Sequence, residues 1–307
     1  MRVVAVAHYG LPHNRGGSEI MLHELLAALV RAGHTAELVV TEHEHPTVTV
    51  DGVTVHHGRH HLDRLAAADL LVTHHKEATP AIAAAKQAGI PTALLVHSDL
   101  PYNRGYLASG PDLVVFNSHH ARQRHRWTGR SLVVNPPVWG HQHATTRGDM
   151  VTLINPIPEK GARLFYQLAA RMRSTRFLAV EGGYGHERQI RRELPNVVWQ
   201  PHTQNMRDDV WARTRILLMP SSYESWGMVG VEAMHSGIPV IAHPTPGLRE
   251  SLATAGTFID RRHVSRWITA IRRLWGDHAA SDRARQRATE LDPTPQLDAW
   301  VREVEAL

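Results

Sequence analysis

The stretch Leu217–Pro244, LLMPSSYESWGMVGVEAMHSGIPVIAHP, decides the fold of the second half of the chain. An apolar run predicts a strand that ends near Met219, and a polar turn follows it. A helix is expected to begin near Gly227 and to stop at Gly237, after which a second apolar run predicts another strand. The stretch therefore predicts a strand–turn–helix–strand unit of an α/β sheet.

Two carboxylates, Glu224 and Glu232, stand in this stretch on either side of the expected helix start. The first N–H groups of a helix have no intrahelical partner, so this end can bind a phosphate group. Carboxylates accept hydrogen bonds from hydroxyls, and two of them beside a phosphate site suit a nucleotide-diphosphate sugar. The alternative is a solvated helix residue and a turn acid. Because Glu232 lies in the apolar run Val229–Met234, we favour the binding role.

The spacing of Glu224 and Glu232, with Pro220-Ser221 before them and Gly237-Ile238-Pro239-Val240 after them, resembles the signature of retaining glycosyltransferases, in particular the GT4 family (glycosyltransferase group 1). The resemblance implies an α/β chain of GT-B architecture, with two Rossmann-like domains whose parallel sheets face an interdomain cleft. It also implies transfer of a hexose-type sugar from a UDP- or GDP-sugar to an acceptor hydroxyl of a carbohydrate, a small molecule or a protein.

The length of 307 residues suits two domains. We expect an N-terminal Rossmann-like, acceptor-side domain over residues 1–143 and a nucleotide-sugar-binding domain over 149–285, with the polar segment His141–Gly148 as the hinge. The resemblance implies that the remaining segment, 286–307, forms a helix that crosses back to the first domain.

A glycine pair, Gly16-Gly17, precedes a helix expected from Ser18 to Ala32, with Ser18 as its N-cap. The pattern is not G-x-G-x-x-G, so no nicotinamide site is predicted. The pair forms a simple turn on the residues alone. The resemblance implies that it faces the donor diphosphate, with Arg15 adding charge.

His97 follows the strand predicted at Ala93–Val96, and sites on open α/β sheets gather at the carboxyl ends of strands. A lone histidine there is often structural. The resemblance implies instead that His97 reaches the donor sugar.

Lys160-Gly161 comes shortly after the strand predicted at Met150–Ile154, and an ammonium at a helix start suits a diphosphate. The family's Lys-Gly motif matches here. Many relatives carry an arginine where this chain has Asn155, and Arg163 or Arg15 is expected to compensate.

The resemblance implies that Glu232 binds the ribose and Glu224 the donor sugar. It assigns catalytic roles to His97, Glu224 and Lys160. The residues expected to bind the donor are Gly16, Gly17, Asn155, Lys160, Arg163, Glu224, Ser225, Trp226, Gly227, Met228, Val229 and Glu232. No Asp-x-Asp motif is present, so the sequence requires neither a metal nor another cofactor.

The composition narrows the class of protein. There is no cysteine and no apolar run long enough to cross a membrane, and the default expectation is a cytoplasmic protein of open oligomeric state. A net charge of +5 suits anionic ligands. Because arginine is spread over several helices, no nucleic-acid partner is expected. The helix predicted at Arg266–Trp275 leaves peripheral membrane contact open, although core packing is favoured.

Histidine occurs 24 times, often in adjacent pairs such as His56-His57, His60-His61 and His74-His75. None has the His-Glu-x-x-His spacing of a zinc protease. We interpret these histidines as surface or hydrogen-bonding residues rather than metal ligands.

Two other function classes share the features described so far. A GT-B sugar-nucleotide epimerase or a phosphorylase would use the same helix-end phosphate site. A non-catalytic nucleotide- or nucleic-acid-binding protein would account for the high pI of about 9.9, and it would bind with a steep dependence on salt.

Overall fold

The computed structural model describes residues 1–307, which divide into two compact units. One unit comprises residues 1–137 together with 293–307, and the other comprises 138–292. The segment expected as a hinge carries a short helix, α5 (Gly140–His143), and lies in the second unit. Of the C-terminal segment, only the last helix, α12 (Thr294–Glu305), groups with the first unit.

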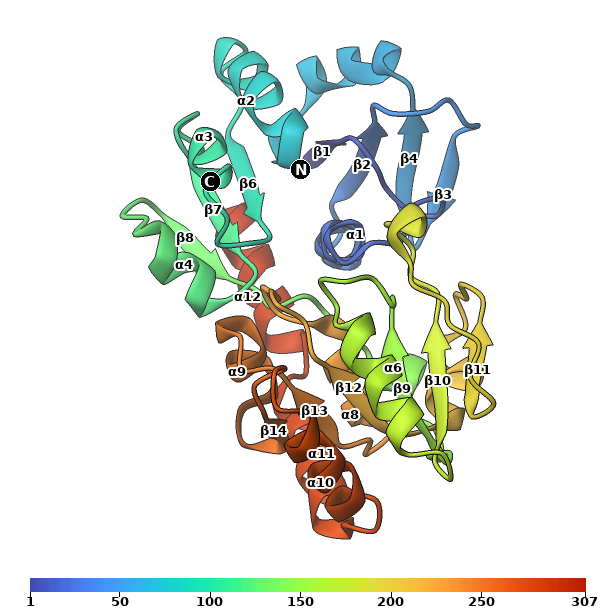
Figure 1. The fold of residues 1–307 in the computed structure, drawn as a ribbon. Helices are drawn as coiled ribbons and strands as arrows, with labels where there is room; N and C mark the ends of the chain where they lie inside the picture. The colour runs from blue at the N-terminus through green and yellow to red at the C-terminus, as the bar shows by residue number, and fades with distance from the viewer. The chain divides into compact units, whose positions relative to one another are not determined.

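An eight-stranded sheet forms the N-terminal unit, in the order β3-β4-β2-β1-β5-β6-β7-β8 (Figure 1). All neighbours are parallel except β3 and β4. The strands are β1 (Arg2–Ala7), β2 (Thr35–Val40), β3 (Val48–Val50), β4 (Val53–His57), β5 (Leu70–His74), β6 (Thr92–Val96), β7 (Leu113–Phe116) and β8 (Ser131–Val133). The short strands β3 and β8 were not predicted, because none of their residues is fully buried and they lack the apolar run of a core strand.

Helices cover this sheet because its strands are apolar on both faces. Alternate strand residues such as Val4, Leu71 and Leu94 pack with α2 (Ala78–Gln87) in one buried cluster. Trp300 of α12 is fully buried, and its indole N–H donates to the carbonyl of Leu25 in α1 at 3.0 Å. The unit's other helices are α1 (Gly17–Arg31), α3 (Asn103–Leu107) and α4 (His119–His125), with 3-10 turns η1 (Arg59–Ala67) and η2 (His75–Glu77).

The C-terminal unit is a six-stranded, wholly parallel sheet in the order β11-β10-β9-β12-β13-β14. Its strands are β9 (Met150–Ile154), β10 (Arg176–Val180), β11 (Val197–Gln200), β12 (Thr214–Met219), β13 (Val240–Ala242) and β14 (Gly256–Phe258). Its main helices are α6 (Ala162–Arg171), α8 (Met228–His235), α9 (Pro246–Leu252), α10 (Val264–Leu274) and α11 (His278–Glu290), with the single turn α7 (Met206–Asp209). The unit thus has the Rossmann-like order expected from Leu217–Pro244.

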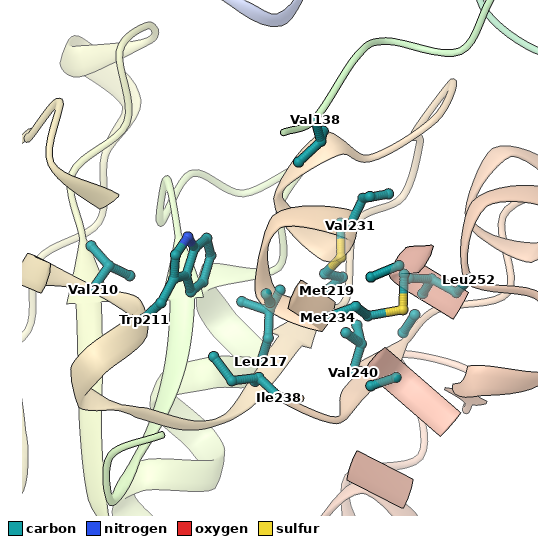
Figure 2. Close-up of a cluster of buried hydrophobic side chains, with 14 of the residues drawn as sticks. Val138, Val210, Trp211, Leu217, Met219, Val231, Met234, Ile238, Val240 and Leu252 are labelled. Atoms are coloured by element: carbon teal, nitrogen blue, oxygen red, sulfur yellow. The ribbon is translucent and has the colours of Figure 1, made fainter. Parts of the chain in front are cut away.

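Two separate cores lie on the two faces of this second sheet. On one face, Leu217 and Met219 of β12 pack with Val231 and Met234 of α8 (Figure 2). On the other face, α6 and α10 pack over alternate residues of the same strands. Trp267 of α10 is fully buried there, so the core-packing interpretation of that helix is confirmed. No helix in the chain combines the length and the apolar character that crossing a bilayer requires.

One local prediction was wrong. Helix α1 is capped by Gly16, while Ser18 lies in its first turn and donates to the Glu19 carboxylate at 3.0 Å. Helix α4 ends at His125, where Arg126 takes a left-handed conformation with φ 52°.

Candidate functional site

The centre of the candidate site is an ion pair between the loops that follow β9 and β12. The Lys160 ammonium donates to Glu224 Oε1 at 2.5 Å, and the Ser221 hydroxyl donates to the same oxygen at 2.8 Å. The two charged side chains are only 22% and 12% exposed. Two residues predicted separately for the diphosphate and the sugar therefore touch one another.

Lys160 stays charged despite its burial. Desolvation alone would lower the pKa of its ammonium, but the Glu224 carboxylate and, beyond it, Tyr184 outweigh that effect and raise the pKa. The loops thus hold a fixed positive charge in a poorly hydrated place, where it acts more strongly on an anion than it would in water.

Backbone contacts fix the loop that carries Lys160. The Ser222 N–H donates to the Glu159 carbonyl at 2.8 Å and joins the two loops. The Arg261 guanidinium donates to the Pro158 carbonyl at 3.0 Å and to that of Glu159 at 3.3 Å. Arg261 was not among the predicted site residues. Its position just after the last strand of the unit, at the edge of the sheet where ligand sites gather, could have identified it.

Two helix starts flank this ion pair, and each is capped by a glycine. Gly227 caps α8 with φ 86°, and Gly161 caps α6 with φ 89°. A side chain at Gly227 would place its Cβ 2.6 Å from Leu248, and one at Gly161 would reach Pro220 at 2.4 Å. The first amides of α8, at Met228 and Val229, have no intrahelical acceptor. Together with Lys160, they form an arrangement suited to a diphosphate.

Glu232 lies on α8 and is only 8% exposed. Burial raises the pKa of its carboxyl to about 7. Its Oε2 has no hydrogen-bond partner, since the nearest cation-forming group, His143 Nδ1, is 3.8 Å away. Burial, aided by His235, lowers the pKa of His143 to about 4, so that imidazole is neutral at pH 7. A buried acceptor without a partner is what a ligand hydroxyl would satisfy.

Asn155 occupies the position where the family resemblance implies an arginine. Its backbone is left-handed, with φ 56°, a conformation that asparagine tolerates well. Its amide donates to the Tyr184 carbonyl at 3.3 Å, while its Oδ1 is buried without a partner. Gly182 is required beside it, because a Cβ there would lie 2.2 Å from the Asn155 side chain. Arg163 is exposed in the first turn of α6.

Trp226 was predicted among the donor-binding residues, but its side chain is 3% exposed and packs in the core with Met219 and Leu248. Its indole therefore supports the turn rather than facing solvent. Ser225, beside it, is partly exposed.

The remaining predicted residues lie in the N-terminal unit. Gly16 caps α1 in an extended conformation, and a Cβ on it would lie 2.2 Å from the Glu19 carboxylate. Gly17 begins the helix and is exposed, as is Arg15. His97 is partly buried after β6, and its Nε2 lies 2.9 Å from Nδ1 of His74.

A glycine outside the predicted set supports the Glu224 loop. A Cβ at Gly247 would lie 2.4 Å from the carbonyl oxygen of Glu224 and 2.5 Å from the Ser225 backbone. Gly247→Ala must therefore shift the loop, and we expect it to weaken nucleotide binding and to cost about 1–3 kcal/mol of stability. Calorimetric titration with UDP and urea unfolding would measure both. Gly276→Ala is the matched control, because a Cβ there meets nothing within 4 Å; equal behaviour of the two variants would contradict the packing argument.

A hollow of about 830 Å³ lies elsewhere in the unit. It is lined by residues such as Asp149, Arg176 and Trp275, at the amino ends of β9 and β10. The candidate site is at the opposite, carboxyl ends of the strands, where ligands of such sheets bind.

The fold is that of GT-B glycosyltransferases, built from two Rossmann-like units. The crystal structure of HepE from Anabaena in complex with UDP-glucose superposes with a TM-score of 0.82, at 15% identity and over 100% of both chains. Sucrose-phosphate synthase from Thermosynechococcus elongatus gives 0.74, at 16% identity, over 100% of this chain and 98% of that one. At such identities the likeness shows the fold alone.

Residues 150–277 match the family described as Glycosyl transferases group 1. This match confirms the resemblance carried by Glu224–Val240. A D-inositol 3-phosphate glycosyltransferase of Paenarthrobacter aurescens (strain TC1) is 34% identical over 86 residues, 27% of this chain and 21% of that protein. One from Corynebacterium kroppenstedtii is 37% identical over 70 residues, 22% of this chain and 16% of that protein. The matches thus span about a fifth of these relatives.

Proposed function

We propose that the protein is a retaining glycosyltransferase of the GT4 type, which transfers a hexose-type sugar from a nucleotide-diphosphate sugar to an acceptor hydroxyl. The observation that carries this proposal is the Lys160–Glu224 pair beside the start of α8, with the unpartnered carboxyl of Glu232 further along the same helix. The site offers a cation and free amides for a diphosphate and two carboxylates for hydroxyls.

In the proposed reaction, the bond between the anomeric carbon and the diphosphate oxygen breaks, and a bond to the acceptor oxygen forms on the same face of the sugar. The leaving diphosphate takes up the negative charge and accepts the acceptor's proton. Lys160 and the amides of Met228 and Val229 stabilise that charge through fixed dipoles. Glu224 orients the sugar hydroxyls and Glu232 those of the ribose.

Glu224 is a positioning group in this scheme rather than a covalent nucleophile. Its Oε1 accepts hydrogen bonds from both Lys160 and Ser221, so it is held rather than free to attack. This arrangement supports direct transfer with stabilisation of the leaving group. The roles of His97, Gly16 and Gly17 rest on the family resemblance and not on the geometry of the Lys160 site.

The donor is expected to be a UDP-sugar in the first instance. HepE, which shares the fold over its whole length, is described in complex with UDP-glucose. The Glu181–Gly185 loop after β10 is expected to contact the nucleotide base through its backbone. Backbone contacts do not distinguish one base from another, so the base is chosen here from HepE alone.

Thermal unfolding in the presence of nucleotides tests the proposal, because a ligand that binds only the native state raises the melting temperature. We expect UDP or GDP to raise it more than the matching nucleoside does. Lys160→Ala should abolish that difference, since the diphosphate loses its fixed cation. Lys86→Ala is the control, because its ammonium only donates to the Ser109 carbonyl in the other unit. No preference for diphosphates in the unmodified protein would contradict a donor site here.

Product analysis then separates transfer from the other reactions of this architecture. A transferase releases free nucleoside diphosphate only when an acceptor sugar is added. An epimerase releases none, and a phosphorylase requires inorganic phosphate. Binding of nucleic acid with a steep salt dependence and no turnover would indicate the non-catalytic class.

A further inference from the structure

Three histidines meet at the carboxyl ends of two neighbouring strands in the N-terminal unit. His74 ends β5, His75 opens η2 directly after it, and His97 follows β6, which pairs with β5. Each offers one ring nitrogen, and these three atoms all lie within 4.8 Å of one another. The ring centroids of His74 and His75 are 4.6 Å apart, and each lies 5.0 Å from that of His97.

The cluster contains buried nitrogen atoms without partners. His74 is fully buried, and its Nε2 has no hydrogen bond; its Nδ1 lies 2.9 Å from Nε2 of His97. A fourth ring, His8, has its centroid 5.5 Å from that of His75, and its Nδ1 is also buried without a partner. Buried polar atoms in folded proteins are nearly always hydrogen-bonded, so these unpaired nitrogen atoms point to a missing ligand.

The donor set defines which ligand fits. All three groups are imidazoles, and a neutral imidazole presents a nitrogen lone pair to a ligand. A neutral imidazole does not repel a cation, and it carries no positive charge that would attract an anion. Imidazole nitrogen suits Zn²⁺, Cu²⁺ or Ni²⁺, whereas Mg²⁺ and Ca²⁺ require oxygen ligands.

We propose that His74, His75 and His97 form a binding site for a divalent d-block cation such as Zn²⁺, with His8 or water in the fourth position. Zinc binds imidazole nitrogen at about 2.0–2.1 Å, so the three rings, whose candidate ligand atoms lie within 4.8 Å of one another, must adjust when the cation binds. The site could not be predicted from the sequence, because His97 lies beside His74 and His75 only through the pairing of β5 with β6.

One consequence rests on the proposed function. If His97 contacts the donor sugar, a cation that binds its ring competes with that contact. Zinc is then expected to slow sugar transfer through the N-terminal unit, without any change at Lys160 or Glu224.

Metal binding is tested on the full chain by calorimetric titration with Zn²⁺ and by the visible absorption of Co²⁺, whose bands report four-coordinate geometry. His75→Asn is the test variant, because asparagine tolerates the left-handed backbone of His75, with φ 52°. Loss of an outer-shell partner costs about 10- to 100-fold in affinity, and loss of a ligand should cost at least about 100-fold. His97→Gln should behave in the same way.

The matched control is the double variant His13→Asn/His45→Asn. It removes two exposed, stacked rings of the same unit, whose centroids are 3.9 Å apart. It should retain the tight site and the Co²⁺ spectrum. Tight binding that survives His75→Asn and His97→Gln, binding that the control abolishes, or no tight binding at all would overturn the proposal. If zinc binds but does not inhibit an active transferase, the metal site stands and the proposed contact of His97 with the donor sugar is refuted. The experiment therefore distinguishes failure of the metal site from failure of the proposed function.

Discussion

Replacing Glu224 with alanine is expected to lower kcat/KM for sugar transfer about 100- to 1,000-fold, the size of effect seen when one preorganised polar contact in an active site is lost. The carboxylate does two things in the structure: it offers an acceptor for sugar hydroxyls, and it holds the Lys160 ammonium at 2.5 Å. Without it, Lys160 loses its main partner in a site that is only 22% exposed. We therefore also expect a loss of about 1–3 kcal/mol in the free energy of unfolding.

Two further variants give this experiment its controls. Glu224→Gln keeps the shape and one acceptor oxygen, so it should retain the fold and separate the loss of charge from the loss of the side chain. Glu159→Ala removes an exposed carboxylate of the Lys160 loop that pairs with Arg188 at 3.0 Å, and it should leave transfer nearly unchanged. An unaltered rate in folded Glu224→Ala would sink the proposed role.

Replacing Glu232 with glutamine is expected to change how stability depends on pH. Burial raises the pKa of this carboxyl to about 7 in the folded protein, against an ordinary value of 4.5. Between these two pKa values the folded state binds more protons than the unfolded state. The free energy of unfolding therefore falls as the pH rises from about 4.5 to 7. Above pH 7 the full penalty applies, about 3 kcal/mol. Glutamine carries no titrating proton, so Glu232→Gln should be the more stable protein at pH 8 by an amount of this order.

Urea unfolding at pH 5, 6, 7 and 8 measures the effect. Glu193→Gln, which alters an exposed glutamate of the same unit, should leave the pH profile unchanged. If Glu232 binds a ribose, hydroxyl donors favour its ionised form, and nucleotide binding near pH 7 should release protons. Titration calorimetry in two buffers of different ionisation enthalpy detects that release. A Glu232→Gln profile that follows the unmodified protein would show that this carboxyl does not titrate as described.

The elements of the fold were largely predictable, because apolar runs such as Val3–Ala7 and Met150–Ile154 are long enough to identify buried parallel strands. The start of α8 at Met228 was also predictable, because a glycine separates a polar turn from an apolar helix. The cap of α1 was not. Ser18 has the right chemistry for a cap, but Gly16 already ends the loop in an extended conformation.

The residues of the candidate site were easier to predict from the sequence than the contacts between them. Lys160 and Glu224 are 64 positions apart and meet only because β9 lies beside β12 in the sheet. Arg261 reaches the Lys160 loop from the end of β14, the far edge of the same sheet. The His74–His97 contact likewise depends on the pairing of β5 with β6. Strand order is set by tertiary packing, which local sequence patterns do not encode.

The Lys160–Glu224 pair has a consequence for the order in which reactants bind and leave. A bare anion that approaches Lys160 competes with the Glu224 carboxylate and offers that carboxylate nothing in return. A nucleotide sugar, on the proposed function, replaces both halves of the pair at once, with phosphate oxygens for the ammonium and hydroxyls for the carboxylate. After transfer the nucleoside diphosphate has lost its hydroxyl-bearing half, and the re-forming ion pair helps to expel it. The pair thus favours intact donor over spent product and limits product inhibition.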